Sequence, residues 1–328
     1  MDDFTVKTFL RPDFYQYFPK FSNIDLANRS SWADFTKATL LGLANIERGL
    51  KIGLISPNLV KLFLRSSKEN QVTQLMEVLL SVGISRRAAK AVRNVPRHFY
   101  CPAWNVQFAY IDASLFFDQF SCLSAPSIVA LMLDRINFER GMKILDVGCG
   151  SCYHAHCASE MCSNDCEIYG IDINSEFLEL GKLALAKSGL KTVQIKHGNA
   201  LNGWPGARQG QFDVMYGAVA LGKTIPQKLI YQLKDGGTIQ FTRPLTRKEF
   251  FSEPPKSWLR TTFASYSNYY RSWRKFGCLV TGQRQGAQII ELERLYDVTF
   301  VPFQKQATIS KKWSPKVDNL QFLRRSLD

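Results

Sequence analysis

Between about residues 142 and 241 the sequence alternates short apolar runs with segments of helical periodicity, and this alternation constrains the fold more than any other feature. The apolar runs predict strands at 143–147, 167–172, 192–197, 212–216 and 236–241. Helices are expected just after residue 150, at 175–188 and at 225–233. Alternation of this kind packs as a mostly parallel sheet with helices on both faces. We therefore expect an α/β, Rossmann-like domain that binds its ligand at the carboxyl ends of the strands.

A Gly-x-Gly turn, Gly148 to Gly150, joins the first predicted strand to the helix after it. Such glycines let the backbone pass close to a ligand, and the helix N-terminus behind them offers free N–H groups. Asp172 ends the next strand, about 20 residues further on, where a carboxylate can hold two ribose hydroxyls. The third glycine of the dinucleotide fingerprint is missing, which disfavours a pyrophosphate. Asp146, just before the glycines, suits a cationic nucleoside, so the pattern favours S-adenosylmethionine (AdoMet) over a core that binds no nucleotide.

Asn199 and Ala200 follow the third predicted strand and are further candidates for the cofactor site. The amide oxygen of Asn199 can accept a hydrogen bond from the adenine amine. The alternative is that Asn199 is a plain turn residue.

The composition is that of a soluble globular protein, with 45% hydrophobic and 21% charged residues in a chain of 328. No stretch approaches the roughly 20 apolar residues of a membrane span, and the N-terminus has no signal-peptide layout, so we expect a cytoplasmic protein. The net charge of +14 favours acidic partners such as nucleic acid, or reflects solubility alone. Five of the eight cysteines lie between Cys149 and Cys166. Their spacing runs through a predicted helix, so we expect reduced thiols and no metal site.

Three regions are expected along the chain. Residues 1–68 predict an N-terminal helical extension, 69–303 the AdoMet-binding domain, and 304–328 a basic C-terminal tail. The domain should begin with helices at 72–80 and 86–92, the first ended by Gly83 and the second capped by Ser85.

Within the domain, residues 244–290 predict a basic-aromatic insert, followed by a final strand at 296–303. From 243 to 284 the sequence has nine Lys/Arg against two Glu, interleaved with Trp and Tyr. This composition suits RNA stacking or a solvated insertion at the sheet edge, and we favour the insertion.

Short motifs follow one another in a fixed order: Val95-Pro96-Arg97, Ala109-Tyr110-Ile111-Asp112, Leu123-Ser124-Ala125-Pro126, Gly203-Trp204-Pro205 and Leu233-Lys234-Asp235-Gly236-Gly237. With these motifs, the stretch from about Gln71 to Phe303 resembles the protein-L-isoaspartate O-methyltransferase family. The resemblance implies a Rossmann-like class I methyltransferase fold and AdoMet as the cofactor. It also implies methyl transfer to the free carboxylate of an isoaspartyl residue in a protein or peptide, a protein-repair reaction.

The resemblance also implies residue roles. Ser124 matches the family serine that holds the acceptor carboxylate, although a helix N-cap is an alternative role on residue type alone. Cys122 stands where the family has a threonine at the edge of the cofactor site. An acceptor carboxylate is already ionised at pH 7 and needs no general base, so alignment with the methyl group can supply most of the acceleration. The candidate site residues are Ser124 as catalytic, and Cys122, Asp146, Gly148, Gly150, Asp172, Asn199 and Ala200 as cofactor-binding, with no metal.

The sequence departs from the family pattern at the edge of the site. Phe117 to Phe120 replace a glycine-containing substrate loop, Ser127 stands where the family has histidine, and Asn199 where it has an acid. Three functions therefore remain open. The favoured one is a carboxyl methyltransferase, and the alternatives are a non-catalytic AdoMet-binding adaptor and an RNA methyltransferase that uses the basic insert.

Overall fold

The structure of the chain is a computed structural model, and it describes residues 67–81, 83–101, 106, 108–112, 114–116, 121–221, 224–244 and 277–298. The predictions for the N-terminal extension up to residue 66, for Phe117–Phe120, for 245–276 and for 299–328 lie outside the described residues. Within the described residues, no helix is both long enough and apolar enough to span a membrane.

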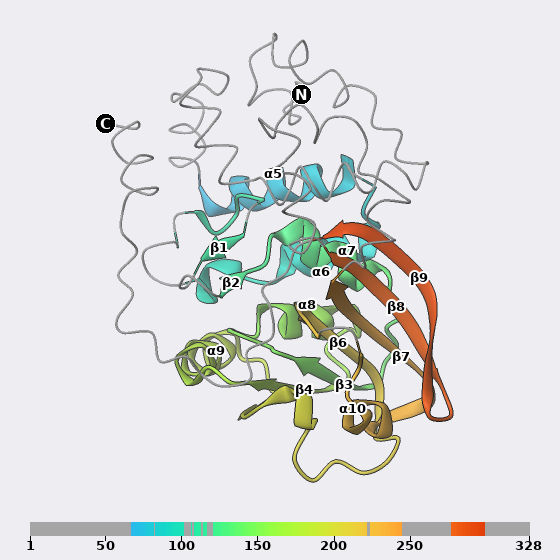
Figure 1. Cartoon of the computed structure of the whole chain (residues 1–328). Coiled ribbons are helices and arrows are strands. Elements are labelled where there is room, and N and C mark those ends of the chain that lie inside the picture. Colours follow the sequence, from blue (N-terminus) through green and yellow to red (C-terminus); the bar gives the residue numbers. More distant parts are fainter. Residues whose placement is uncertain are drawn as a thin grey trace, which may run out of the picture.

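The described strands form a seven-stranded sheet in the order β5-β4-β3-β6-β7-β8-β9, with a separate two-stranded ribbon, β1-β2 (Figure 1). The strands are β1 (Leu115–Phe116), β2 (Cys122–Leu123), β3 (Lys143–Val147), β4 (Glu167–Asp172), β5 (Val193–His197), β6 (Phe212–Ala220), β7 (Leu233–Pro244), β8 (Gly277–Gln285) and β9 (Gln288–Val298). Strands β3 to β7 are parallel, and β8 and β9 are antiparallel additions beside β7. The Rossmann-like α/β fold expected from the sequence is confirmed.

The described helices are α5 (Lys68–Ser81), α6 (Arg86–Asn94), α7 (Pro126–Asp134), α8 (Tyr153–Met161), α9 (Ser175–Ser188) and α10 (Gln227–Gln232), with short 3-10 helices η3 (Arg97–Phe99) and η5 (Ala200–Asn202). Of these, α8, α9 and α10 alternate with the parallel strands as expected. The predicted helix pair before the sheet is confirmed: α5 ends just before Gly83, and the Ser85 side chain caps α6 by accepting from Ala88 N.

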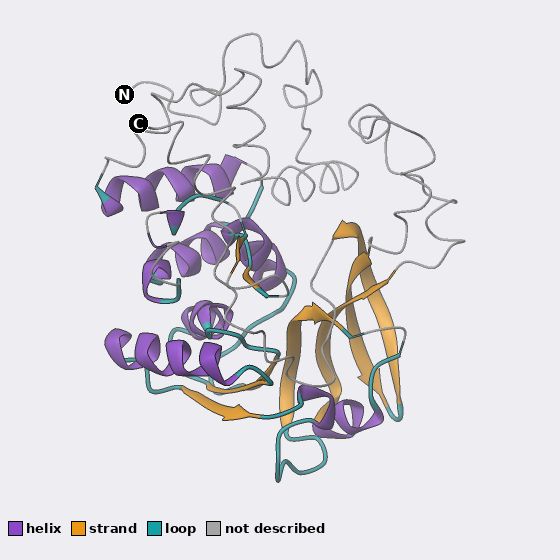
Figure 2. Cartoon of the chain, turned by 60° about the vertical axis from the view of Figure 1, so that its left-hand side comes forward, coloured by secondary structure: helices purple, strands orange, loops and turns teal. Residues whose placement is uncertain are grey.

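Two apolar layers hold the sheet between its helices, because successive strand residues point to opposite faces. On one face, Ile144 of β3 and Val214 of β6 pack with the buried sides of α6, α8 and α9. On the other face, Leu145 and Met215 pack with α10 and Trp204. Figure 2 shows the stacked helices beside the twisted sheet. Both faces of the parallel strands are therefore covered, which leaves their carboxyl edge for a ligand.

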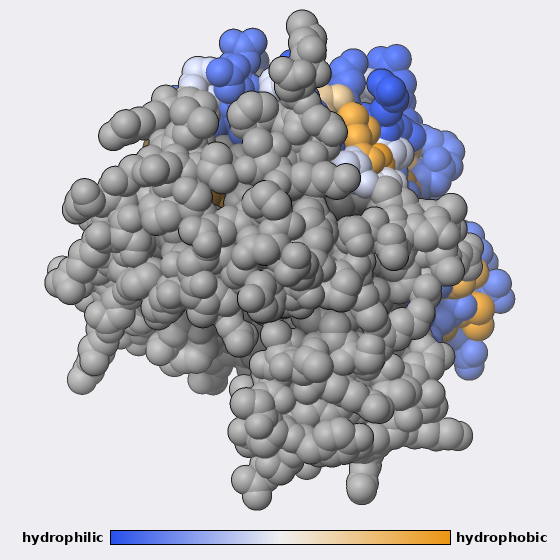
Figure 3. All heavy atoms as spheres, turned by 90° about the horizontal axis from the view of Figure 1, so that it is seen from above, coloured by the Kyte–Doolittle hydropathy of each residue, from blue (hydrophilic) through white to orange (hydrophobic). Residues whose placement is uncertain are grey.

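Strands β8 and β9 fall partly in the range expected to be an insert. β8 pairs along β7 from Thr238↔Gln283 to Pro244↔Gly277, and β9 begins at Gln288, eight residues before the final strand expected from the sequence. β9 exposes Ile290 and Leu292. In the view from above, the described residues that reach the rim are mostly hydrophilic, with small hydrophobic patches among them (Figure 3). The antiparallel hairpin belongs to the sheet, and only 245–276 of the expected insert lies outside the described residues.

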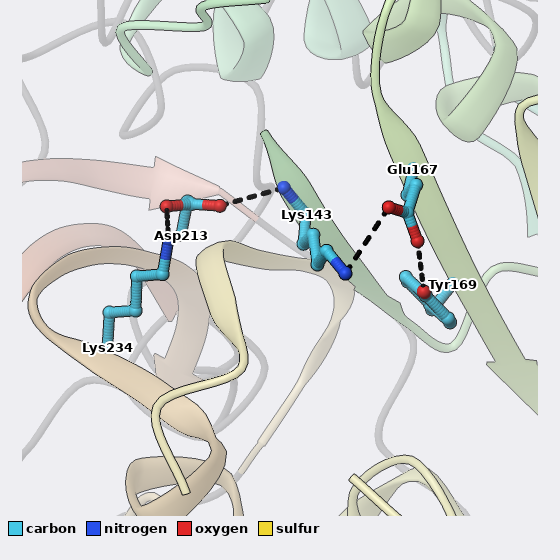
Figure 4. Close-up of polar contacts among 5 residues, drawn as sticks. All are labelled: Lys143, Glu167, Tyr169, Asp213 and Lys234. Carbon is cyan, nitrogen blue, oxygen red and sulfur yellow. Dashed lines mark hydrogen bonds and ion pairs between the residues drawn. The ribbon is translucent and has the colours of Figure 1, made fainter. Parts of the chain in front are cut away.

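A polar network joins the amino-terminal ends of the strands, at the edge opposite the ligand edge (Figure 4). Asp213 of β6 accepts a hydrogen bond from Lys143 N at 2.8 Å and pairs with Lys234 of β7. The Lys143 ammonium lies 3.3 Å from Glu167, which also accepts from the Tyr169 hydroxyl. Exposed ion pairs contribute little stability, so we expect the bond to the backbone N–H of Lys143 to be the important one.

Candidate functional site

The turn after β3 requires glycine at its first position. Gly148 has φ +79°, and a Cβ there would lie 2.8 Å from Cγ1 of Val219. Its N–H donates to Ile171 O of β4 at 2.9 Å, which pulls the turn toward the neighbouring strand. Gly150 has φ +54°, and a Cβ on it would meet no atom within 4 Å. The backbone at Gly150 therefore faces open space, as a ligand-binding turn should.

Asp172 at the end of β4 is bound directly to this turn. One carboxylate oxygen accepts from Gly150 N and the other from Asn174 N, each at 2.8 Å. Burial raises the pKa of Asp172, while the hydrogen bonds from Asn174 and Gly150 oppose that rise. A carboxylate has about four acceptor positions, so Asp172 keeps acceptor capacity for a ligand beside these backbone donors. The two sequence motifs that predicted a nucleoside site are thus in contact.

The loop after β5 reaches the same edge. Gly198 N donates to the backbone oxygen of Asp172 at 2.8 Å. Asn199 uses its amide oxygen to cap η5, accepting from Leu201 N at 3.0 Å, while Ala200 is buried. Asn199 is only partly buried, and its amide keeps a second lone pair and two N–H donors. The structure thus brings Asn199 beside Asp172 in a turn-capping role that does not use up its hydrogen-bonding capacity.

Asp146 lies beneath the turn, not on its surface. It is 1% exposed, and its Oδ2 has no hydrogen-bond partner in the described part of the chain. It pairs in register with Tyr216 of β6, on the sheet face that α8 covers. Burial, and then the nearby charge of Asp172, raise the pKa of Asp146 well above its usual range. The cofactor-binding role of Asp146 stays a prediction, and its burial means that the side chain does not lie on the open face of the turn.

Ser124 lies where the β1-β2 ribbon joins α7. It is partly exposed, and its hydroxyl makes no hydrogen bond to any residue that the structure describes. The alternative role as helix cap is wrong, because the N-cap of α7 is Ala125 and no side chain of the cap residue bonds the helix. Cys122, two residues earlier in β2, pairs in register with Phe116 and is also partly exposed. The Ser124 hydroxyl is therefore available to a ligand.

Arg97 belongs to the motif Val95-Pro96-Arg97, and its role is visible only in the structure. Its buried guanidinium donates to Ala109 O at 2.6 Å and to Ser124 O at 2.8 Å. It also lies over the ring of Tyr153, the first residue of α8, with 5.4 Å to the centroid. Arg97 therefore links the Ser124 segment to the helix that follows the glycine turn. The only signal in the sequence was an arginine inside an otherwise apolar motif.

The cysteines around α8 are free thiols. Cys149 Sγ and Cys152 Sγ are 3.9 Å apart, and both side chains are buried. Among the described residues, no three His, Cys, Asp or Glu side chains gather in a way that could hold a metal ion. Burial also raises the pKa of Cys157 well above its usual range, which keeps that thiol protonated.

Comparison with known proteins assigns this site to a family. The family described as Protein-L-isoaspartate(D-aspartate) O-methyltransferase (PCMT) matches residues 70–248. A protein-L-isoaspartate O-methyltransferase from Opitutus terrae is 34% identical over 164 residues, which cover 50% of this chain and 68% of that protein.

Solved structures show the same fold. One protein-L-isoaspartate O-methyltransferase structure aligns with a TM-score of 0.56 and 19% identity, and covers 70% of this chain and 65% of that one. A Plasmodium falciparum protein of the same description, in complex with S-adenosyl-L-homocysteine, aligns with a TM-score of 0.53 and 17% identity. That match covers 74% of this chain and 100% of the other.

Proposed function

Because the chain belongs to the protein-L-isoaspartate(D-aspartate) O-methyltransferase family, we propose that it transfers the methyl group of AdoMet to a carboxylate on a protein or peptide. The observation that carries the proposal is the bond between Asp172 and Gly150 N. It joins the acid that can hold a ribose to the turn that lets a ligand approach. An isoaspartyl residue is the acceptor we favour, since that is the acceptor that the relatives' names give.

The cofactor would lie across the carboxyl ends of β3, β4 and β5. Gly148 and Gly150 shape the turn, Asp172 takes the ribose hydroxyls, and Asn199 and Ala200 flank the adenine. Cys122 would border the site from the β1-β2 ribbon. AdoMet, when bound, supplies an electrophilic methyl group on a sulfonium. The remaining task for the chain is to align the acceptor, because the carboxylate nucleophile is already charged at neutral pH.

Ser124 is the residue we propose for that alignment. Its hydroxyl has no hydrogen bond within the described residues, so it can donate to the acceptor carboxylate without breaking one. A hydrogen bond to a charged group contributes about 1.5–3 kcal/mol, of which the part made only in the transition state raises kcat. Alignment by one hydroxyl needs no proton transfer and no metal.

A methyl-transfer assay tests the proposal. The purified protein, with labelled AdoMet, should form a base-labile methyl ester on an isoaspartyl peptide and not on the matched aspartyl peptide. Ser124→Ala should lower kcat about 10-fold or more while S-adenosylhomocysteine affinity stays within about twofold, and Ser81→Ala on α5 is the matched control. Normal cofactor binding with no ester on either peptide would favour an adaptor. Nuclease-sensitive nucleic acid bound at low salt would favour RNA as the acceptor.

We also propose a cytoplasmic location. All eight cysteines are free, and seven of them are buried. Thiols of this kind persist in reducing compartments and are uncommon in secreted proteins of comparable cysteine content. Thiol titration of protein taken directly from its native cell should give eight free thiols after denaturation.

A further inference from the structure

Ser124 and Ala125 join β2 to Pro126, the first residue of α7, and this short connection, here called the turn, must be positioned through its backbone. The Ser124 hydroxyl has no hydrogen bond in the described residues, and the following helix has no side-chain cap of its own. The β1-β2 ribbon fixes the entry to the turn through the pair Leu115↔Leu123. The position of the turn is therefore set by side chains from other segments of the chain.

One bond holds the start of the turn. Arg97 donates to the backbone oxygen of Ser124 at 2.8 Å, while its second donor reaches Ala109 O at 2.6 Å. A guanidinium is a planar fork with fixed donor directions, so two bonded carbonyls determine its place. Arg97 is 0% exposed, and Tyr153 stacks against it from α8. The start of the turn is thereby fixed relative to the helix behind the glycine turn.

A second bond holds the end of the turn. Asp112 Oδ1 accepts from Ser127 N at 2.9 Å, which satisfies a backbone donor in the first turn of α7. Asp112 belongs to the same motif as Ala109, the other carbonyl that Arg97 binds. Burial raises the pKa of Asp112, while the Ser127 N–H and the charge of Arg97 oppose that rise. Two side chains of opposite sign therefore hold the two ends of one turn.

We propose that Arg97 and Asp112 are positioning residues for methyl transfer, which set the place of the Ser124 hydroxyl from either end of its turn. Neither side chain needs to touch the acceptor or the cofactor. The inference rests on the proposed function, because it assigns a purpose to the alignment of Ser124. It explains why motifs at 95–97, 109–112 and 123–126, separated in sequence, converge at one point.

The matched variants are Asp112→Ala, which removes the acceptor for Ser127 N, and Asp112→Asn, which keeps an acceptor oxygen of the same shape. At the other end, Arg97→Lys keeps the charge but loses the fork. We expect Asp112→Ala to lower kcat about 10–100-fold, since a displacement of about 1 Å can cost about 100-fold. Asp112→Asn should restore most of kcat. Affinity for S-adenosylhomocysteine, measured by calorimetry, should stay within about threefold for all of them.

A double mutant separates positioning from a general structural effect. If Asp112 acts through Ser124, then Ser124→Ala combined with Asp112→Ala should be no slower than Ser124→Ala alone, within about twofold. If the two kcat losses multiply in the double mutant, the residues act independently and the inference is wrong. A loss of cofactor affinity in Asp112→Ala as large as its loss in kcat would also overturn it. Hydrogen exchange supplies a readout that does not depend on activity. The Ser127 amide should exchange faster in Asp112→Ala, and an unchanged exchange rate would show that Asp112 does not hold this amide.

The wild-type protein separates the two ideas. If it binds S-adenosylhomocysteine but methylates no peptide, the proposed function fails. If it methylates the isoaspartyl peptide, and the kcat loss of the double mutant equals the product of the two single losses, only the positioning role fails. Should Arg97→Lys not fold, the Asp112 pair and the double mutant still decide the question.

Discussion

Replacing Asp172 by alanine removes the residue that joins β4 to the glycine turn. In the folded protein its two oxygens accept from Gly150 N and Asn174 N at 2.8 Å each. Gly150 and Asn174 are partly exposed, so water can replace part of the hydrogen bonding that their N–H groups lose. We expect unfolding free energy to fall by about 1–3 kcal/mol. The proposed ribose contacts use the remaining acceptor positions and vanish with the side chain.

The expected loss in cofactor binding follows from those contacts. Two hydroxyls that lose a charged acceptor should cost about 1–3 kcal/mol, which weakens Kd by roughly 5- to 150-fold. Asp172→Asn keeps one oxygen for a backbone donor, so it should recover stability but little affinity. Titration calorimetry with S-adenosylhomocysteine gives the Kd, and urea denaturation gives the stability.

Asp213→Ala is the matched control at the opposite edge of the sheet. Asp213 also accepts from a backbone N–H, that of Lys143, at 2.8 Å. Its loss should lower stability by a comparable amount and leave the Kd unchanged, because it lies at the amino-terminal ends of the strands. Folded Asp172→Ala protein that binds within about twofold of the wild type would refute the assignment of Asp172 to the ribose.

The structure predicts two further effects. Gly148→Ala should destabilise the fold by about 1–3 kcal/mol, since φ is +79° and the new Cβ would meet Val219 at 2.8 Å; an unchanged urea midpoint would contradict this. Burial, then Lys68 and Lys187, lower the pKa of His98 from 6.5 to about 4, so the unfolded chain binds more protons between these values. Stability should fall as the pH falls from 6.5 toward 4, and His98→Gln should flatten that fall, which denaturation at pH 7 and pH 4.5 measures.

The parallel half of the fold was predictable because local signals agreed with one another. The buried strand before Gly148 and the helix capped by Asn174 each carry a pattern that tertiary structure did not override. The place of Asp172 beside the glycine turn could be predicted because the βαβ geometry fixes the strand length and the spacing from the glycines. The helix pair around Gly83 and Ser85 followed from turn and cap chemistry alone.

Strand β8 was not predicted, for a physical reason. Its only apolar run, Cys278 to Val280, is three residues long and lies between Gly277 and Gly282, which is too short to predict a strand. Its pairing partner β7 is more than thirty residues away along the chain. Strand pairing over such a separation cannot be predicted from the pattern of neighbouring residues in the sequence. The roles of Arg97 and Asp112 were missed likewise, because each depends on a backbone group that only the fold brings within reach.

The pairing of Pro244 with Gly277 determines where the chain leaves and rejoins the sheet. β7 runs parallel to β3, so this pair lies toward the same rim as the glycine turn. A connection anchored there can lengthen, shorten or change composition without shifting any strand. Evolution can thus vary the length and composition of the chain between Pro244 and Gly277 while the strands that carry the glycine turn and Asp172 stay as they are.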